Sequence, residues 1–199
     1  MSEKKTSKFD LIISGVGGQG TILASDIIGK AAVLSGYSVR AAETHGMAQR
    51  GGSVINHIRI GCDLGSLIPP GGADIMLALE PSEAIRYIEY LSPGGTVIMN
   101  TEPVYPVSVL SGKSKYPDIS AILKELEDNF TVNSFDATGL ARKAGHQQSM
   151  NVVMVGALSN YLPFESEVLV GCIKEMVPPR TLDINMEAFR LGKSQITDQ

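Results

Sequence analysis

The sequence predicts one α/β domain with a Rossmann-like, doubly wound and mostly parallel sheet flanked by helices. Three observations carry this prediction. Short apolar runs of strand length alternate with segments of helical periodicity, a glycine-rich turn follows the first apolar run, and no break in composition divides the 199 residues into two units. Such alternation is typical of parallel strands with helices on both faces of the sheet.

The chain opens with a strand, a glycine turn and a helix. Residues 9–14 form an apolar run that leads directly into Gly15-x-Gly17-x-x-Gly20. Residues 21–35 then show helical periodicity, and Gly36 is placed to end the helix. Residues 37–43 predict a second strand, which would complete a βαβ unit with parallel strands and a right-handed crossover.

The remainder of the chain continues the alternation. Strands are predicted at residues 53–60, 74–79, 96–100 and 130–135, and helices at residues 81–91, 120–127, 138–144 and 149–161. The region 164–199 contains two amphipathic segments, which would form helices that pack on the domain or on a partner. Residues 104–117 predict a long loop, and residues 1–8 are expected to be flexible.

Charge and hydropathy exclude several classes of partner. The net charge is −4 and the Lys and Arg residues are scattered, so no nucleic-acid partner is expected. No apolar stretch reaches the length of a membrane span, and the one after the polar start is too short for a signal peptide. We therefore expect no membrane partner and a cytoplasmic location.

Cysteine and histidine spacing gives no metal signature. Cys62 and Cys172 are far apart and belong to no cluster-ligand motif, so this chain is not expected to hold an iron–sulfur cluster alone. His45, His57 and His146 also lack the spacing of a zinc site, so no metal is predicted.

The glycine turn has two interpretations. Glycines between a strand and a helix let backbone amides and the helix dipole approach a phosphate, and Glu43 at the end of the next strand could bind a ribose of NAD. A stand-alone NAD-dependent dehydrogenase is therefore one alternative. The same glycines also serve close packing of helix on sheet without any ligand, which would suit a structural or regulatory Rossmann domain.

The segment Thr44-His45-Gly46-Met47-Ala48-Gln49-Arg50-Gly51-Gly52 places polar groups among glycines directly after a strand. It should lie near the carboxyl edge of the sheet, where open α/β sheets bind ligands. His45 could transfer a proton, Gln49 could hydrogen-bond, and Arg50 could hold a carboxylate or phosphate. Alternatively, the segment packs on a neighbouring subunit.

Together, the two glycine-containing motifs resemble the gamma-domain family of 2-oxoacid:ferredoxin oxidoreductases. The first motif is the run from Ile13 to Gly20, and the second is the more specific Glu43-to-Gly52 segment. The His-Gly-Met-Ala-Gln-Arg-Gly-Gly form of the second motif looks like the indolepyruvate branch, in which the small subunit is a separate chain called beta. The likeness extends over most of the sequence.

The resemblance implies a function that requires a second chain. In that family a large (alpha) subunit carries thiamine diphosphate with Mg and iron–sulfur clusters, and the complex converts an arylpyruvate, coenzyme A and oxidised ferredoxin to acyl-CoA, CO2 and reduced ferredoxin. This chain would bind none of these cofactors alone, would not be active alone, and could form a homodimer when isolated. The sequence does not identify the 2-oxoacid.

The candidate site residues follow from the same two motifs. His45 and Arg50 are the catalytic candidates. The glycine loop would face a phosphate, another anion or the partner subunit; it comprises Gly15, Gly17, Gly18, Gln19 and Gly20. The second segment would face substrate, coenzyme A or the partner; its candidates are Thr44, His45, Gly46, Gln49, Arg50, Gly51 and Gly52.

Overall fold

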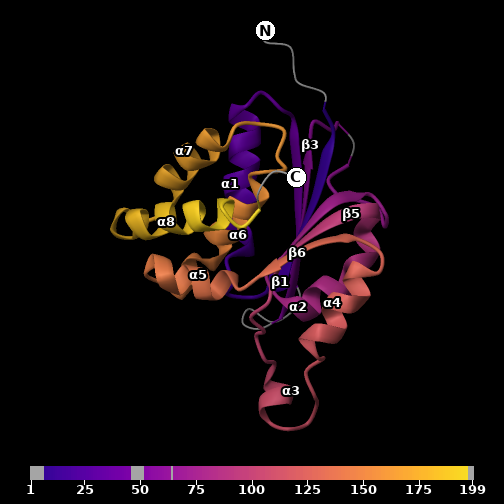
Figure 1. Cartoon of the computed structure of the whole chain (residues 1–199). Coiled ribbons are helices and arrows are strands. Elements are labelled where there is room, and N and C mark those ends of the chain that lie inside the picture. Colours follow the sequence, from indigo (N-terminus) through magenta and orange to yellow (C-terminus); the bar gives the residue numbers. More distant parts are fainter. Residues whose placement is uncertain (1–6, 46–51, 64, 197–199) are drawn as a thin grey trace.

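The computed structural model describes residues 7–45, 52–63 and 65–196, which form a six-stranded sheet with helices on both faces (Figure 1). The strands are β1 (Phe9–Val16), β2 (Val39–His45), β3 (Ser53–Ile60), β4 (Ala73–Ala78), β5 (Leu91–Asn100) and β6 (Thr131–Phe135). The helices are α1 (Thr21–Leu34), α2 (Pro81–Arg86), α3 (Val107–Leu110), α4 (Ile119–Glu127), α5 (Ala137–Ala144), α6 (Met150–Leu158), α7 (Ser166–Met176) and α8 (Leu182–Lys193).

The sheet has the order β2-β3-β1-β4-β5-β6. β1, β4, β5 and β6 pair in parallel, whereas β3 runs antiparallel to both of its neighbours, β1 and β2. β3 is therefore the one strand of the described sheet that runs against the others. The prediction of a doubly wound, mostly parallel sheet is confirmed.

The expected βαβ unit is not formed as predicted. β2 does run parallel to β1, but β3 lies between the two strands. β3 follows β2 after a short connection and returns beside it in the antiparallel sense, and it is buried from Val54 to Ile60, which suits an interior strand. As a result Glu43 pairs with Asn56 of β3, so the carboxylate proposed for an NAD ribose is one strand removed from its expected place beside β1.

Alternate side chains along the strands point to opposite faces of the sheet and pack into two separate hydrophobic cores. Leu11 and Ile13 of β1 pack with α1, α5, α6, α7 and α8 on one face. Ile12 faces the opposite side, where the core is completed by α2 and α4. Figure 1 shows the larger helical layer on the side of α1 and α6 and the smaller one on the side of α2 and α4.

The C-terminal helix packs closely across the buried helix α6, in which every residue from Met150 to Leu158 is buried. A Cβ atom at Gly192 of α8 would lie 1.8 Å from the Val153 carbonyl oxygen. A Cβ atom at Gly156 of α6 would lie 2.2 Å from the Phe189 carbonyl oxygen. Two glycines thus let the helices approach to backbone contact.

Among the described residues, no helix is long and apolar enough to cross a membrane.

The helix predicted at residues 81–91 is wrong in its second half. α2 ends at Arg86, a 3-10 turn covers Ile88–Tyr90, and β5 already begins at Leu91. Leu91 pairs with Ala73 of β4, so pairing with the neighbouring strand overrides local helical periodicity. The predicted long loop at residues 104–117 contains the short helix α3.

Candidate functional site

The carboxyl edge of the sheet has a topological switch point between β1 and β4. From β1 the chain moves to β2 and β3 on one side, then crosses to β4 on the other. Open α/β sheets bind ligands at this place. The glycine loop after β1 and the segment after β4 meet here, where the Leu79 amide donates to the Ser14 carbonyl at 2.8 Å.

Gln19 braces the glycine loop from within. Its Oε1 accepts a hydrogen bond from the Val16 amide at 2.9 Å, and its Nε2 donates to the Leu79 carbonyl at 3.0 Å. A Cβ at Gly15 would approach Gln19 Oε1 to 2.8 Å, so a larger residue there would displace the brace. The Gln19 side chain therefore joins the ends of β1 and β4, and the Val16 amide is already bonded and unavailable to a phosphate.

Gly20 and Gly18 have opposite surroundings. Gly20 precedes α1 with φ of 77°, and a Cβ there would lie 2.4 Å from Asn151 Nδ2, which donates to the Gly20 carbonyl at 3.2 Å. Gly18 has φ of 100° and is exposed, with no atom within 4 Å of an added Cβ. The loop is thus packed at Gly20 and open at Gly18, which is where a ligand or partner could approach its backbone.

A pocket of about 240 Å³ opens beside Gly18. Its walls come from the glycine loop, the segment after β5, α5 and the turn before α6. The lining residues are Gly18, Gln19, Glu102, Pro103, Val104, Thr138, Arg142, Gln147, Gln148 and Met150. Arg142 is paired with Glu102 at 3.0 Å. The pocket is smaller than typical sites for drug-sized ligands, so it could hold a small polar group but could not enclose a dinucleotide.

The second motif is joined to the glycine loop at one end. The Gly17 amide donates to the Gly52 carbonyl at 2.8 Å, and Ser53 of β3 pairs with Val16 of β1. Thr44 and the backbone of His45 complete β2 at the same edge of the sheet. The candidates Gly46, Gln49, Arg50 and Gly51 lie outside the described residues. The Gly52 end of the segment is therefore beside the glycine loop, and the Thr44 end lies at the same edge of the sheet with β3 in between.

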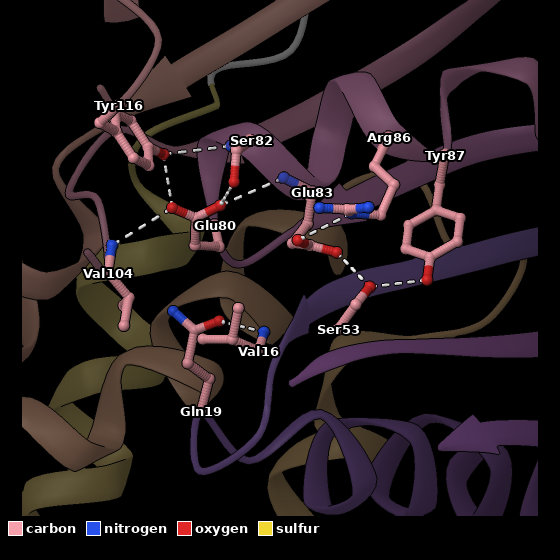
Figure 2. Close-up of polar contacts among 10 residues, drawn as sticks. All are labelled: Val16, Gln19, Ser53, Glu80, Ser82, Glu83, Arg86, Tyr87, Val104 and Tyr116. Carbon is pink, nitrogen blue, oxygen red and sulfur yellow. Dashed lines mark hydrogen bonds and ion pairs between the residues drawn. The ribbon is translucent and has the colours of Figure 1, made fainter. Parts of the chain in front are cut away.

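Glu80, which follows β4, is fully buried and accepts four hydrogen bonds (Figure 2). Oε2 accepts from the Ser82 hydroxyl at 2.6 Å and the Glu83 amide at 3.1 Å. Oε1 accepts from the Val104 amide at 3.2 Å and from the Tyr116 hydroxyl. Glu80 thus caps α2 and also holds the segment after β5, and it does not line a crevice.

A second buried carboxylate fixes α2 to β3. Glu83 accepts hydrogen bonds from the Ser53 hydroxyl and from Arg86 Nε, the latter at 3.1 Å (Figure 2). The Ser53 hydroxyl lies 2.6 Å from the Tyr87 hydroxyl. Because Ser53 begins β3, this network anchors the strand directly after the second motif.

Asn100, at the end of β5, organises the carboxyl edge of the sheet, and the sequence analysis did not predict this role. Its Nδ2 donates to the Leu79 carbonyl at 3.1 Å and the Thr138 hydroxyl at 3.2 Å, and its Oδ1 accepts from the Ala137 amide at 3.1 Å. It therefore ties β4, β5 and the start of α5 together. The sequence signal for this residue is one polar amide side chain at the end of an apolar strand. Asp136, the neighbouring acid, caps α5 through the Gly139 amide at 2.6 Å.

Within the described part of the chain, the side chains do not fit an iron–sulfur cluster. A cluster requires several thiolates together, but Cys62 and Cys172 are both buried, one after β3 and the other in α7. Across residues 7–45, 52–63 and 65–196, no three His, Cys, Asp or Glu side chains are arranged to hold a metal ion.

Comparisons with known proteins agree with the resemblance. The family model for pyruvate ferredoxin/flavodoxin oxidoreductase matches residues 10–195. Indolepyruvate oxidoreductase subunit IorB of Thermococcus kodakarensis is 45% identical over 93% of this chain and 94% of that protein. IorB of Archaeoglobus fulgidus is 44% identical over 94% of this chain and 95% of that protein.

A solved structure shares the fold. Pyruvate oxidoreductase subunit PORC from Thermotoga maritima superposes with a TM-score of 0.73 at 24% identity, covering 94% of this chain and 96% of that chain. Together with the family model and the relatives, this confirms what the two motifs indicated. The chain belongs to the pyruvate ferredoxin/flavodoxin oxidoreductase family.

Proposed function

We propose that this chain is the small subunit of an indolepyruvate-type 2-oxoacid:ferredoxin oxidoreductase. The observation that carries the proposal is 44–45% identity, along nearly the whole length, to proteins called indolepyruvate oxidoreductase subunits. The complex would convert a 2-oxoacid, coenzyme A and two oxidised ferredoxins to acyl-CoA, CO2, two reduced ferredoxins and two protons. Which 2-oxoacid is used would be decided mainly by the partner.

The cofactors are assigned to the large subunit and not to this chain. The two cysteines are both buried and lie in separate segments, and we assign the iron–sulfur clusters and thiamine diphosphate with Mg to the large subunit, as the resemblance implies. Ferredoxin would meet the assembled complex, and the isolated small chain could self-associate. A cytoplasmic location suits two free, buried thiols.

The carboxyl edge of the sheet is the face we assign to the partner. Gly18 is exposed there, Gln19 holds the loop rigidly, and the Gly17–Gly52 hydrogen bond brings the second motif alongside. Backbone amides of the loop and the Arg50 guanidinium would steer a substrate carboxylate or a coenzyme A phosphate, and His45 could take part in proton transfer. A rigid loop loses little conformational entropy on docking.

The same arrangement weighs against a stand-alone NAD-dependent dehydrogenase. β3 separates Glu43 from β1, and the pocket beside Gly18 is too small for a dinucleotide. Micromolar binding of NAD to the isolated chain, measured by calorimetry, would contradict the proposed function.

The test is reconstitution. We expect the co-expressed large subunit to co-purify with this chain and to reduce ferredoxin, or a dye, only when indolepyruvate, thiamine diphosphate and coenzyme A are all present. Arg50→Ala combined with His45→Ala should preserve assembly but reduce turnover, if the second motif contacts substrate or coenzyme A. Unchanged turnover would mean that the segment only packs on the partner, and failure of the wild-type chains to assemble would contradict the subunit assignment.

A further inference from the structure

A projecting arm, residues 103–117, leaves the body of the molecule after β5 and carries α3 at its tip (Figure 1). Of the eight large apolar side chains that the described residues expose, four lie on the arm: Val104, Tyr105, Val107 and Leu110. Val107 is 79% and Leu110 72% exposed, the highest values of the eight. An apolar patch concentrated on a protrusion indicates a binding surface.

The arm is an ordered structure in spite of its exposure. The amides of Lys113 and Ser114 both donate to the Ser108 carbonyl, at 2.8 and 3.1 Å, which closes the tip. At its base the rings of Tyr105 and Tyr116 meet edge to face, with centroids 5.2 Å apart. These contacts give the arm a defined shape before any partner is bound, as in a compact Ω-loop.

The arm is also fixed to the sheet at both ends of its base. Glu80 Oε1 accepts hydrogen bonds from the Val104 amide and the Tyr116 hydroxyl (Figure 2). Val104 lies where the chain enters the arm, and Tyr116 lies where the chain leaves it. Burial of Tyr116 and its hydrogen bond to Glu80 hold the pKa of that phenol well above its usual value, so the hydroxyl keeps its proton and remains a hydrogen-bond donor. A fixed base presents the apolar tip in one direction.

The charge of the arm differs from that of the whole chain. Residues 103–117 contain Lys113 and Lys115 and no Asp or Glu, whereas the chain has a net charge of −4. Both lysines are exposed and form no ion pair among the described residues. The surface that receives the arm should therefore combine an apolar hollow with acidic side chains at its rim.

The arm is continuous with the edge assigned to the partner. Val104 at its base lines the same pocket as Gly18 and Gln19 of the glycine loop. A subunit that covers the glycine loop would thus reach the base of the arm as well. This continuity favours one partner for both surfaces.

We infer that the projecting arm is a docking element whose apolar tip inserts into an acid-rimmed apolar hollow on the large subunit. The inference rests on the proposed function and adds the element that makes the contact. Because the arm is folded in advance, little of the binding free energy is spent on ordering it. Val107 and Leu110 are the anchors, and Lys113 and Lys115 set the orientation.

The test compares two matched double variants in complex with the co-expressed large subunit. Val107→Ser with Leu110→Ser removes the apolar tip, and Val33→Ser with Leu34→Ser removes two exposed apolar residues at the end of α1. All four positions are exposed, so both variants should fold, which circular dichroism checks. We expect the arm variant to raise the Kd for the large subunit by about 30-fold or more. The α1 variant should stay within about threefold of the wild type.

Trypsin provides a second readout that needs no variant. Cleavage after the exposed Lys113 and Lys115 requires the arm to open, and it should be at least about tenfold slower in the complex than in the free chain, because docking covers the tip. An arm variant that binds as tightly as the wild type, or equal cleavage in the free and bound chains, would overturn the inference while leaving the subunit assignment intact. Loss of self-association alone in the arm variant would instead identify a second copy as the occupant. Failure of the wild-type chain to bind the large subunit would remove the proposed function itself.

Discussion

Glu80 and Tyr116 form a hydrogen bond that links a fully buried carboxylate at the end of β4 to the returning end of the projecting arm. Tyr116→Phe removes this bond, together with the one that the hydroxyl accepts from the Ser82 amide at 3.2 Å, and keeps the ring contact with Tyr105. A hydrogen bond to a charged group contributes about 1.5 kcal/mol or more, so opening of the arm should become about tenfold more frequent. Faster trypsin cleavage after Lys113 and Lys115 would measure it.

Tyr105→Phe is the control for that variant. The Tyr105 hydroxyl makes no hydrogen bond within the described part of the chain, although its ring packs on Tyr116. We expect its cleavage rate to match that of the wild type. Equal rates for Tyr116→Phe and Tyr105→Phe would show that the bonds of the Tyr116 hydroxyl to Glu80 and Ser82 do not hold the arm.

Asp10 and Arg59 form a buried ion pair at the amino edge of the sheet. Arg59 Nε and Nη2 donate to the two carboxylate oxygens at 3.0 and 2.9 Å, and both side chains are almost fully inaccessible. Asp10→Asn leaves the guanidinium buried without its counter-charge, so the free energy of unfolding should fall by about 3–5 kcal/mol. Urea denaturation measures the loss.

An exposed pair supplies the comparison. Glu187 and Arg190 pair in the same bidentate manner on the surface of α8. Glu187→Gln should leave the urea midpoint almost unchanged, because solvent screens an exposed pair. Similar losses in Asp10→Asn and Glu187→Gln would contradict the role that we assign to burial.

His57 should make stability depend on pH. It is buried in β3, its Nδ1 accepts the Ile68 amide at 3.2 Å, and burial, followed by the charge of Arg59, lowers its pKa below 6.5. As the pH falls below about 6.5, the unfolded chain takes up this proton before the folded chain does, so the free energy of unfolding decreases. The contribution is fully present at higher pH.

Urea titrations between pH 7.5 and 5 test this expectation, with His57→Asn as the reference. The variant is expected to be less stable at every pH, since the edge-to-face contact with Tyr90 is lost. Its stability should nevertheless decline less steeply below pH 6.5. An identical slope in both proteins would mean that other groups cause the acid sensitivity.

The fold could be predicted from the sequence wherever local pattern and long-range pairing agree. The apolar runs near Leu11 and Val97 became parallel interior strands, and Gly36, with φ of 89°, does end α1. The insertion of β3 between β1 and β2 could not be predicted, because an apolar strand such as Ser53–Ile60 fits either orientation until its partners are known. The end of α2 at Arg86 could not be predicted either, because it depends on the pairing of Leu91 with Ala73 of the neighbouring strand.

The glycine loop and the described ends of the second motif lie at the carboxyl edge of the sheet, where the sequence predicts them, but their internal contacts were not foreseen. Gln19 belongs to a loop that was expected to face an anion or the partner subunit, yet its side chain donates to the Leu79 carbonyl, sixty residues away. The contacts of Glu80 with Val104 and Tyr116 likewise depend on a loop that is distant in the sequence. Such pairs are set by the tertiary fold, so a single sequence carries no periodic signal for them.

The glycine loop offers a final prediction, because its two ends separate packing from recognition. Gly20→Ala would place a Cβ 2.4 Å from Asn151 Nδ2 at a positive φ, and should cost about 2 kcal/mol or more of unfolding free energy. Gly18→Ala meets no neighbouring atom, so only its backbone strain of about 1–2 kcal/mol remains and the chain should fold. If the loop backbone contacts the partner or its ligand, the Gly18→Ala subunit will assemble poorly or turn over slowly despite a native circular dichroism spectrum. Wild-type assembly and turnover with Gly18→Ala would instead show that the exposed end of the loop faces solvent in the complex, and that the function of the edge lies with the second motif.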